Sequence, residues 1–143
     1  MNRRLLLGLI FFISININAA QQIPNIVVSI KPIHSIVSAL MNGVSKPQLL
    51  LDSNDSAHTF HLKPSQLNLL SKADLIITIG DYFEAGLSKG LRHINEKSLL
   101  ALSEINELRI HNSRNQDGNS GTEEQKDLHL WLDVDNVQMI AQL

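Results

Sequence analysis

The chain has 143 residues and a formal net charge of −2, and it contains no cysteine. A mildly acidic chain without a basic stripe gives no reason to expect nucleic acid as a partner. The absence of cysteine excludes a disulfide framework and a lipid-anchored cysteine. The length suffices for one compact domain held by an apolar core or by a ligand.

The first twenty residues are predicted to be a secretory signal peptide. Two arginines precede the apolar run Leu5–Ile15, and small residues close the segment at Ala20. The run is too short to span a bilayer, which favours a cleaved signal over a retained membrane anchor. We therefore expect an exported protein that begins near residue 21.

Four short apolar runs are predicted as strands, at residues 26–30, 48–51, 75–79 and 98–102. Continuous apolar runs are typical of strands covered on both faces, as in a parallel sheet. Helical patterns lie between them, after Pro32, after Pro64 and from Phe83 to Leu91. This alternation predicts an α/β lobe over residues 21–111, with a four-stranded, mostly parallel sheet flanked by helices.

The segment 112–127 differs because it contains no apolar residue and is rich in Asn, Gly, Ser and charge. Such a composition predicts a flexible polar loop at the surface. The apolar pattern resumes over residues 128–143, where Asp133 and Asp135 are candidate caps of a last helix. The chain ends at Leu143 without a helix stop signal, which indicates the start of a truncated helix.

Histidines are the candidate metal ligands, and the chain has six: His34, His58, His61, His93, His111 and His129. His58 follows the second predicted strand, and His129 follows the polar loop after the fourth. Both lie beyond the carboxyl ends of strands, where open α/β sheets bind ligands. Two imidazoles there would form half of a tetrahedral zinc site, with Asp52, Asp55 and Asp133 as candidates to orient the rings.

Four motifs occur in order along the chain: VVSIKPIHSIVSAL, SAHTFHLKPSQ, ADLIITIGDYFE and DLHLWLD. Together they resemble the zinc-type solute-binding proteins of ABC importers, in particular the ZnuA group. That family has two α/β lobes joined by a long helix, with the metal held between the lobes. The resemblance therefore implies that this chain is the N-terminal half of a two-lobed metal-binding protein.

The resemblance also assigns site residues. His58 and His129 match the two metal ligands of the N-terminal lobe, and a third histidine would come from the other lobe. His61 and His34 are candidate accessory ligands. His93 is assigned to the surface, and Trp131 is assigned to packing against the wall of the site. The sequence departs from the family pattern at Ala57 and Gln66. It also departs in the polar loop, which has only His111 at its edge, and we interpret this loop as a solvated linker rather than a metal-gathering segment.

The function that the resemblance implies is capture of Zn²⁺ in the periplasm and its delivery to the membrane permease of an ABC importer, by a monomer without catalysis. The first alternative is a manganese-binding protein of the same family, although imidazole ligands favour zinc. An exported zinc hydrolase is a second alternative, but the sequence has no H-E-x-x-H or G-x-S-x-G motif. A metal-independent interaction domain is a third, and no exposed apolar stripe supports it.

Overall fold

A four-stranded parallel sheet forms the centre of the protein. The computed structural model describes residues 23–52, 56–57, 60–92, 94, 98–113 and 126–143. The strands are β1 (Ile26–Val28), β2 (Gln48–Leu49), β3 (Leu75–Thr78) and β4 (Leu99–Ala101), in the spatial order β2-β1-β3-β4. All three pairings are parallel. The predicted four-stranded α/β sheet is confirmed, although each strand is shorter than the apolar run that predicted it.

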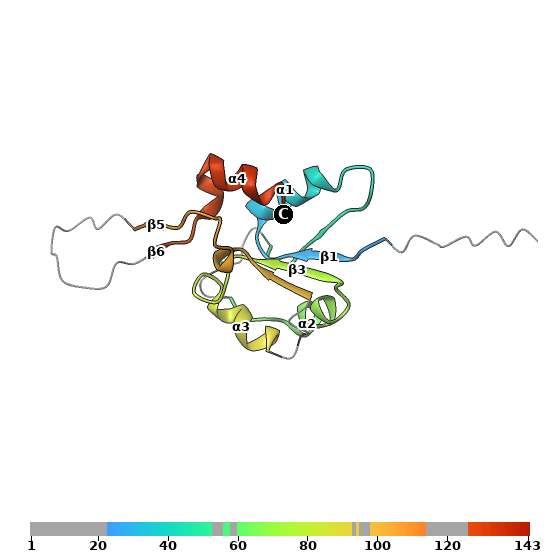
Figure 1. The fold of residues 1–143 in the computed structure, drawn as a ribbon. Coiled ribbons are helices and arrows are strands. Elements are labelled where there is room, and N and C mark those ends of the chain that lie inside the picture. Colours follow the sequence, from blue (N-terminus) through green and yellow to red (C-terminus); the bar gives the residue numbers. More distant parts are fainter. Residues whose placement is uncertain (1–22, 53–55, 58–59, 93, 95–97, 114–125) are drawn as a thin grey trace, which may run out of the picture.

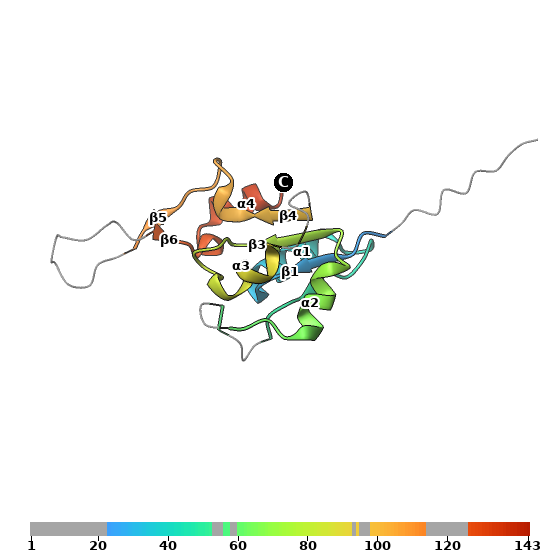
Figure 2. The same cartoon turned by 90° about the horizontal axis from the view of Figure 1, so that it is seen from below.

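Helices cover both faces of this sheet. They are α1 (Lys31–Leu40), α2 (Pro64–Ser71), α3 (Ala85–Leu91) and α4 (Val134–Ile140). Figure 1 shows α1 and α4 on one face and α2 and α3 on the other. Figure 2, which views the protein from below, has α2 and α3 on the near side of the sheet. α1 and α2 each have a proline in the first turn, where its fixed φ suits a helix and its missing N–H is not needed.

The core explains why the strands read as continuous apolar runs. Val27, Val28 and Ile76 on the two central strands are fully buried, because helices pack against both of their faces. Ile33 of α1 and Leu87 of α3, each about 1% exposed, close the core from opposite sides. Burial of such side chains contributes about 1.5–3 kcal/mol each.

A two-stranded antiparallel ribbon lies outside the sheet. It consists of β5 (His111–Asn112) and β6 (Lys126–Asp127), with His111 opposite Asp127. The ribbon projects from the end of the molecule at which the sheet strands finish (Figure 1). The predicted loop, 112–127, falls mostly outside the described residues. Its first residue and its last two are paired in this ribbon.

The third helix begins later than the sequence suggests. Phe83 lies in a turn before α3, with its backbone N–H bonded to the Gly80 carbonyl at 3.0 Å. Phe83 is nonetheless buried. This is why it fits the apolar spacing of a helix although it lies outside α3. Within the described part of the chain, no helix has the length and apolar composition of a membrane span.

Candidate metal centre

His129 is held in a fixed orientation by a carboxylate two residues before it. Oδ1 of Asp127 accepts a hydrogen bond from the His129 backbone N–H at 3.0 Å and another from ring nitrogen Nδ1 at 2.6 Å. A carboxylate can only accept, so Nδ1 carries the proton. Hydrogen bonds from the His129 backbone N–H, which has the larger effect, and from its ring N–H hold the pKa of Asp127 below its usual range. Both side chains are a little over two-fifths exposed, so this pair lies at the surface.

Two aromatic side chains pack edge-on against the same imidazole. The ring centroid of His129 lies 5.3 Å from that of Phe83 and 5.2 Å from that of Trp131. Phe83 and Trp131 also contact each other, at 5.7 Å and an interplanar angle of 85°. Phe83 comes from the turn after β3, so the cluster lies beyond the carboxyl end of a sheet strand. Trp131 is half-buried and packs against the hydrophobic core.

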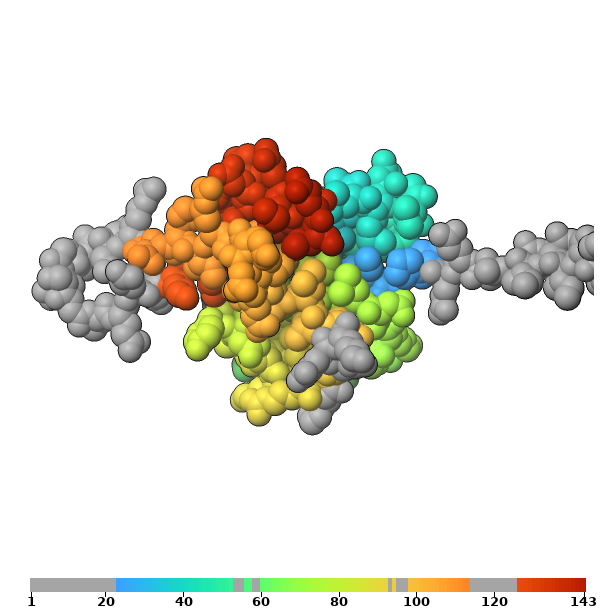
Figure 3. Space-filling model, viewed as in Figure 1, coloured from blue at the N-terminus to red at the C-terminus, as the bar shows by residue number. Residues whose placement is uncertain are grey.

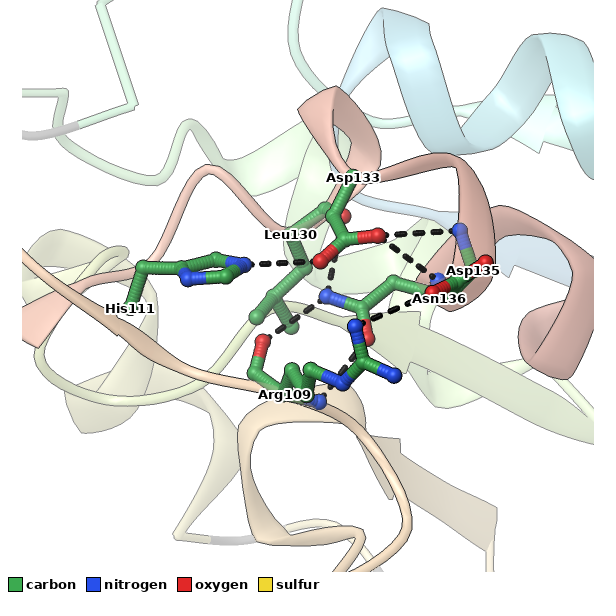
Figure 4. Close-up of polar contacts among 6 residues, drawn as sticks. All are labelled: Arg109, His111, Leu130, Asp133, Asp135 and Asn136. Atoms are coloured by element: carbon green, nitrogen blue, oxygen red, sulfur yellow. Dashed lines mark hydrogen bonds and ion pairs between the residues drawn. The ribbon is translucent and has the colours of Figure 1, made fainter.

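A buried amide joins the segment that carries His129 to a distant part of the chain. Asn136 Oδ1 accepts from the Arg109 backbone N–H at 2.8 Å, and Nδ2 donates to the Arg109 carbonyl at 2.8 Å and to the Leu130 carbonyl at 3.3 Å (Figure 4). The side chain thus pairs with Arg109 as a neighbouring strand would. Figure 3 shows the orange segment that precedes the grey residues lying against the red C-terminal segment.

A second histidine–aspartate pair lies beside the first. His111 Nε2 donates to Asp133 Oδ2 at 2.7 Å, and Asp133 Oδ1 accepts from the Asp135 backbone N–H at 2.9 Å, which caps α4 (Figure 4). The bond from His111 lowers the pKa of Asp133. An open recess lies between these groups and is lined by Arg109, His111, Asn112, Ser113, Asp127, His129, Leu130, Leu132, Asp133 and Val134.

The other predicted ligands differ in what the structure describes. His58 and His93 lie outside the described residues. His61 is exposed just before α2. His34 is engaged within the fold, because its Nε2 donates to the Pro47 carbonyl at 3.0 Å and its Nδ1 lies 3.5 Å from the Ser38 hydroxyl. Among the described residues, no three His, Cys, Asp or Glu side chains converge as a metal site requires.

The carboxylate that orients His129 differs from those the sequence suggested. Asp133 pairs with His111 instead, Asp55 lies outside the described residues, and Asp52 is exposed. Asp127 was assigned to the polar loop. The sequence signal that could have identified Asp127 as the partner of His129 is the spacing D-x-H, because an aspartate readily accepts a hydrogen bond from the backbone N–H two residues later.

Gln66, which replaces an acidic residue of the family pattern, has a role that an aspartate could not fill. Its Oε1 accepts from the Lys63 backbone N–H at 2.8 Å, and its Nε2 donates to the Leu50 carbonyl at 2.8 Å. An aspartate would lack the donor for the second bond. Gln66 therefore joins the start of α2 to Leu50, the residue that follows β2.

Comparisons with known proteins identify the family. Residues 26–143 match the family model of ZnuA, described as "Zinc-uptake complex component A periplasmic". A high-affinity zinc uptake system protein ZnuA of Brucella abortus is 44% identical over 71 residues, which cover 50% of this chain and 21% of that protein. An uncharacterized protein of Rickettsia prowazekii is 28% identical over 134 residues, 94% of this chain and 40% of that protein. The chain thus spans well under half the length of these relatives.

Solved structures agree with the fold. A zinc-bound ZnuA deletion mutant superposes with a TM-score of 0.67 at 25% identity, over 83% of this chain and 43% of that one. A manganese-bound periplasmic metal-binding protein from Candidatus Liberibacter asiaticus gives a TM-score of 0.65 at 15% identity, over 82% of this chain and 41% of that one. Since the family match covers most of the sequence, the chain belongs to the ZnuA family of periplasmic zinc-uptake components.

Proposed function

We propose that the protein is the zinc-binding component of an ABC importer, which captures Zn²⁺ in the periplasm and delivers it to a membrane permease. The observation that carries this proposal is the Asp127–His129 pair. With Nδ1 bonded to a carboxylate, Nε2 is the nitrogen that would bind the metal. A carboxylate–histidine pair of this kind fixes the tautomer and the orientation of a zinc-binding imidazole.

His58 is the proposed second ligand, and its described neighbours support this assignment. Phe60 is buried, and its carbonyl oxygen lies so close to Gly86 that a Cβ there would collide with it. Gly86 is three residues from Phe83, which contacts His129. His58 precedes Phe60 by two residues, and two residues span at most about 7 Å. The described end of this segment, at Phe60, therefore packs against α3, the helix that follows the turn of Phe83.

The remaining coordination is assigned to a part of the protein beyond this lobe. Two imidazoles fill half of a tetrahedral zinc sphere, and a structural zinc site has four protein ligands. We propose that residues 21–111 and 128–143 form the N-terminal metal-binding lobe, and that a second lobe completes the site. His61 is kept as an accessory candidate because it is exposed near the same segment, whereas the bond from His34 to Pro47 favours a structural role.

Zinc is the proposed cargo rather than manganese. The two proposed ligands are imidazoles, which suit zinc, whereas manganese favours carboxylate and carbonyl oxygen. The Brucella relative carries zinc uptake in its name, while the manganese-bound neighbour shares only the fold at 15% identity. Export through the predicted N-terminal signal peptide would bring the protein to the compartment in which its family works.

The test is a competitive titration of the purified protein with Zn²⁺ and Mn²⁺ against a chromophoric chelator. We expect one zinc per chain, bound more tightly than manganese, and a loss of at least tenfold in His58→Ala and in His129→Ala. His111→Ala is the matched control, because His111 lines the same recess but donates to Asp133. Equal zinc binding by His129→Ala and the wild type would refute the assignment, and manganese bound as tightly as zinc would refute the choice of metal.

A further inference from the structure

A buried carboxylate braces the turn that follows β3. Glu84 is only 1% exposed, and its Oε2 accepts from the backbone N–H groups of Ile79 at 2.9 Å and Gly80 at 3.1 Å. The Gly80 carbonyl in turn accepts from the N–H groups of Phe83 and Glu84, both at 3.0 Å. Gly80 has φ +143°, and a Cβ there would collide with the Ser103 hydroxyl, so this tight geometry requires glycine.

The braced turn carries one residue of the candidate metal centre. Phe83 is the residue immediately before Glu84, and its ring meets the His129 imidazole edge-on, at an interplanar angle of 88°. Asp127 restrains one edge of that imidazole, while Phe83 and Trp131 restrain its tilt. A shift of the turn at residues 80–83 would therefore change the direction in which the metal-binding nitrogen points.

Glu84 is a costly group for the fold to bury. Burial raises its pKa, and the Ser29 hydroxyl and the two backbone N–H groups lower it, which offsets part of that effect. Among the described residues, Glu84 Oε1 and Ser29 Oγ have no hydrogen-bond partner of ordinary geometry, although the two groups are neighbours. Unpaired buried polar atoms cost about 1–3 kcal/mol each, which an apolar side chain at this position would avoid. Net stability is therefore a poor explanation for Glu84, whereas control of the turn is a direct consequence of its bonds.

We infer that Glu84 is a positioning residue for zinc binding, which fixes the turn at residues 80–83 and, through Phe83, sets the orientation of the His129 imidazole. This inference rests on the proposed function of His129. It adds to the site a residue that acts through Phe83 rather than by binding the metal. It also predicts that Glu84 and Phe83 act as one unit rather than independently.

The test compares the purified full-length variants Glu84→Asp, Glu84→Gln, Phe83→Leu and the double variant Phe83→Leu/Glu84→Asp. Aspartate is one methylene too short to reach both N–H groups, whereas glutamine retains an oxygen that accepts from both. We expect Glu84→Asp and Phe83→Leu each to lower zinc affinity about tenfold, the double variant to lose no more than the larger single loss, and Glu84→Gln to stay within about threefold of the wild type. Leu91→Ala, at the far end of α3, is the control for destabilisation alone and should keep its affinity.

A second readout needs no metal. The ring-proton NMR shifts of His129 report the ring currents of Phe83 and Trp131, so they should move towards exposed-histidine values in Glu84→Asp and Phe83→Leu but not in Glu84→Gln. Unchanged shifts in Glu84→Asp, or additive losses of affinity in the double variant, would overturn the positioning role. If His129→Ala bound zinc as the wild type does, the proposed function would fail, and the NMR shifts would still decide whether Glu84 positions the ring.

Discussion

Asp127 and His129 form two hydrogen bonds through a single carboxylate oxygen, one to the ring at 2.6 Å and one to the backbone at 3.0 Å. The pair therefore fixes the side chain and the local chain together. Asp127 also lies opposite His111 in the β5–β6 ribbon, at the base of the predicted polar loop. The same residue therefore belongs to the ribbon and orients the candidate ligand His129. Any change in the ribbon that moves Asp127 would reach the imidazole directly.

Asp127→Asn should weaken zinc binding about tenfold, and Asp127→Ala up to about a hundredfold, because loss of the partner of a metal-binding histidine typically costs affinity in this range. The amide of asparagine keeps an acceptor for Nδ1 but loses the negative charge. Asp135→Asn is the matched control, since it removes the same charge from a residue that pairs with Arg109 instead. Equal losses in the two variants would mean that overall charge, rather than the bond to His129, sets the affinity.

The sequence was sufficient to predict the sheet but not the contacts around His129. Helices that cover both faces of β1 and β3 leave continuous apolar runs, which can be recognised locally. By contrast, Asn136 bonds to Arg109 across 27 positions, and no local pattern encodes that partner. Phe83 fits the spacing of the apolar residues of a helix because it is buried, although it lies in a turn. Burial was thus predictable, whereas the long-range polar partners were not.

Glu84 should make stability depend on pH in a direction opposite to that of most carboxylates. Its pKa in the folded protein is raised above the ordinary value of about 4.5, chiefly by burial. Its contribution to stability is then fully present below that value and is lost as the pH rises through the raised pKa, because the unfolded chain releases the proton first. The difference in free energy of unfolding between the wild type and Glu84→Gln, measured with urea from pH 4 upwards, should therefore shift against the wild type as the pH rises. A difference independent of pH would contradict the raised pKa.

Asn136→Ala should destabilise the protein far more than Arg109→Ala, although both residues belong to one network (Figure 4). Asn136 is 2% exposed, and its loss leaves the backbone N–H and C=O of Arg109 without their partner, whereas the Leu130 carbonyl still accepts from the Asp133 N–H at 3.4 Å. We expect a loss of about 3 kcal/mol, because each of the two part-buried groups of Arg109 left unpaired costs about 1–3 kcal/mol. The Arg109–Asp135 ion pair is about two-thirds exposed, and such pairs contribute about 0–1 kcal/mol. Urea unfolding of both variants measures the contrast, and equal losses would rule out the amide as the main tie between residue 109 and α4.

Gly86→Ala and Gly90→Ala separate the packing of the His58 segment from the stability of α3. Both substitutions gain up to about 1 kcal/mol from the better helix propensity of alanine. At Gly90 the new methyl group meets the ends of the Leu62 and Leu67 side chains, which can move aside. At Gly86 it meets the backbone carbonyl of Phe60, which cannot move without shifting the segment two residues from His58. We expect Gly86→Ala to lose about 1–3 kcal/mol of stability and to bind zinc more weakly, whereas Gly90→Ala should retain both properties. If Gly86→Ala kept wild-type affinity despite its lost stability, His58 would not depend on the contact of Phe60 with α3, and its place in the proposed ligand set would lose its main structural support.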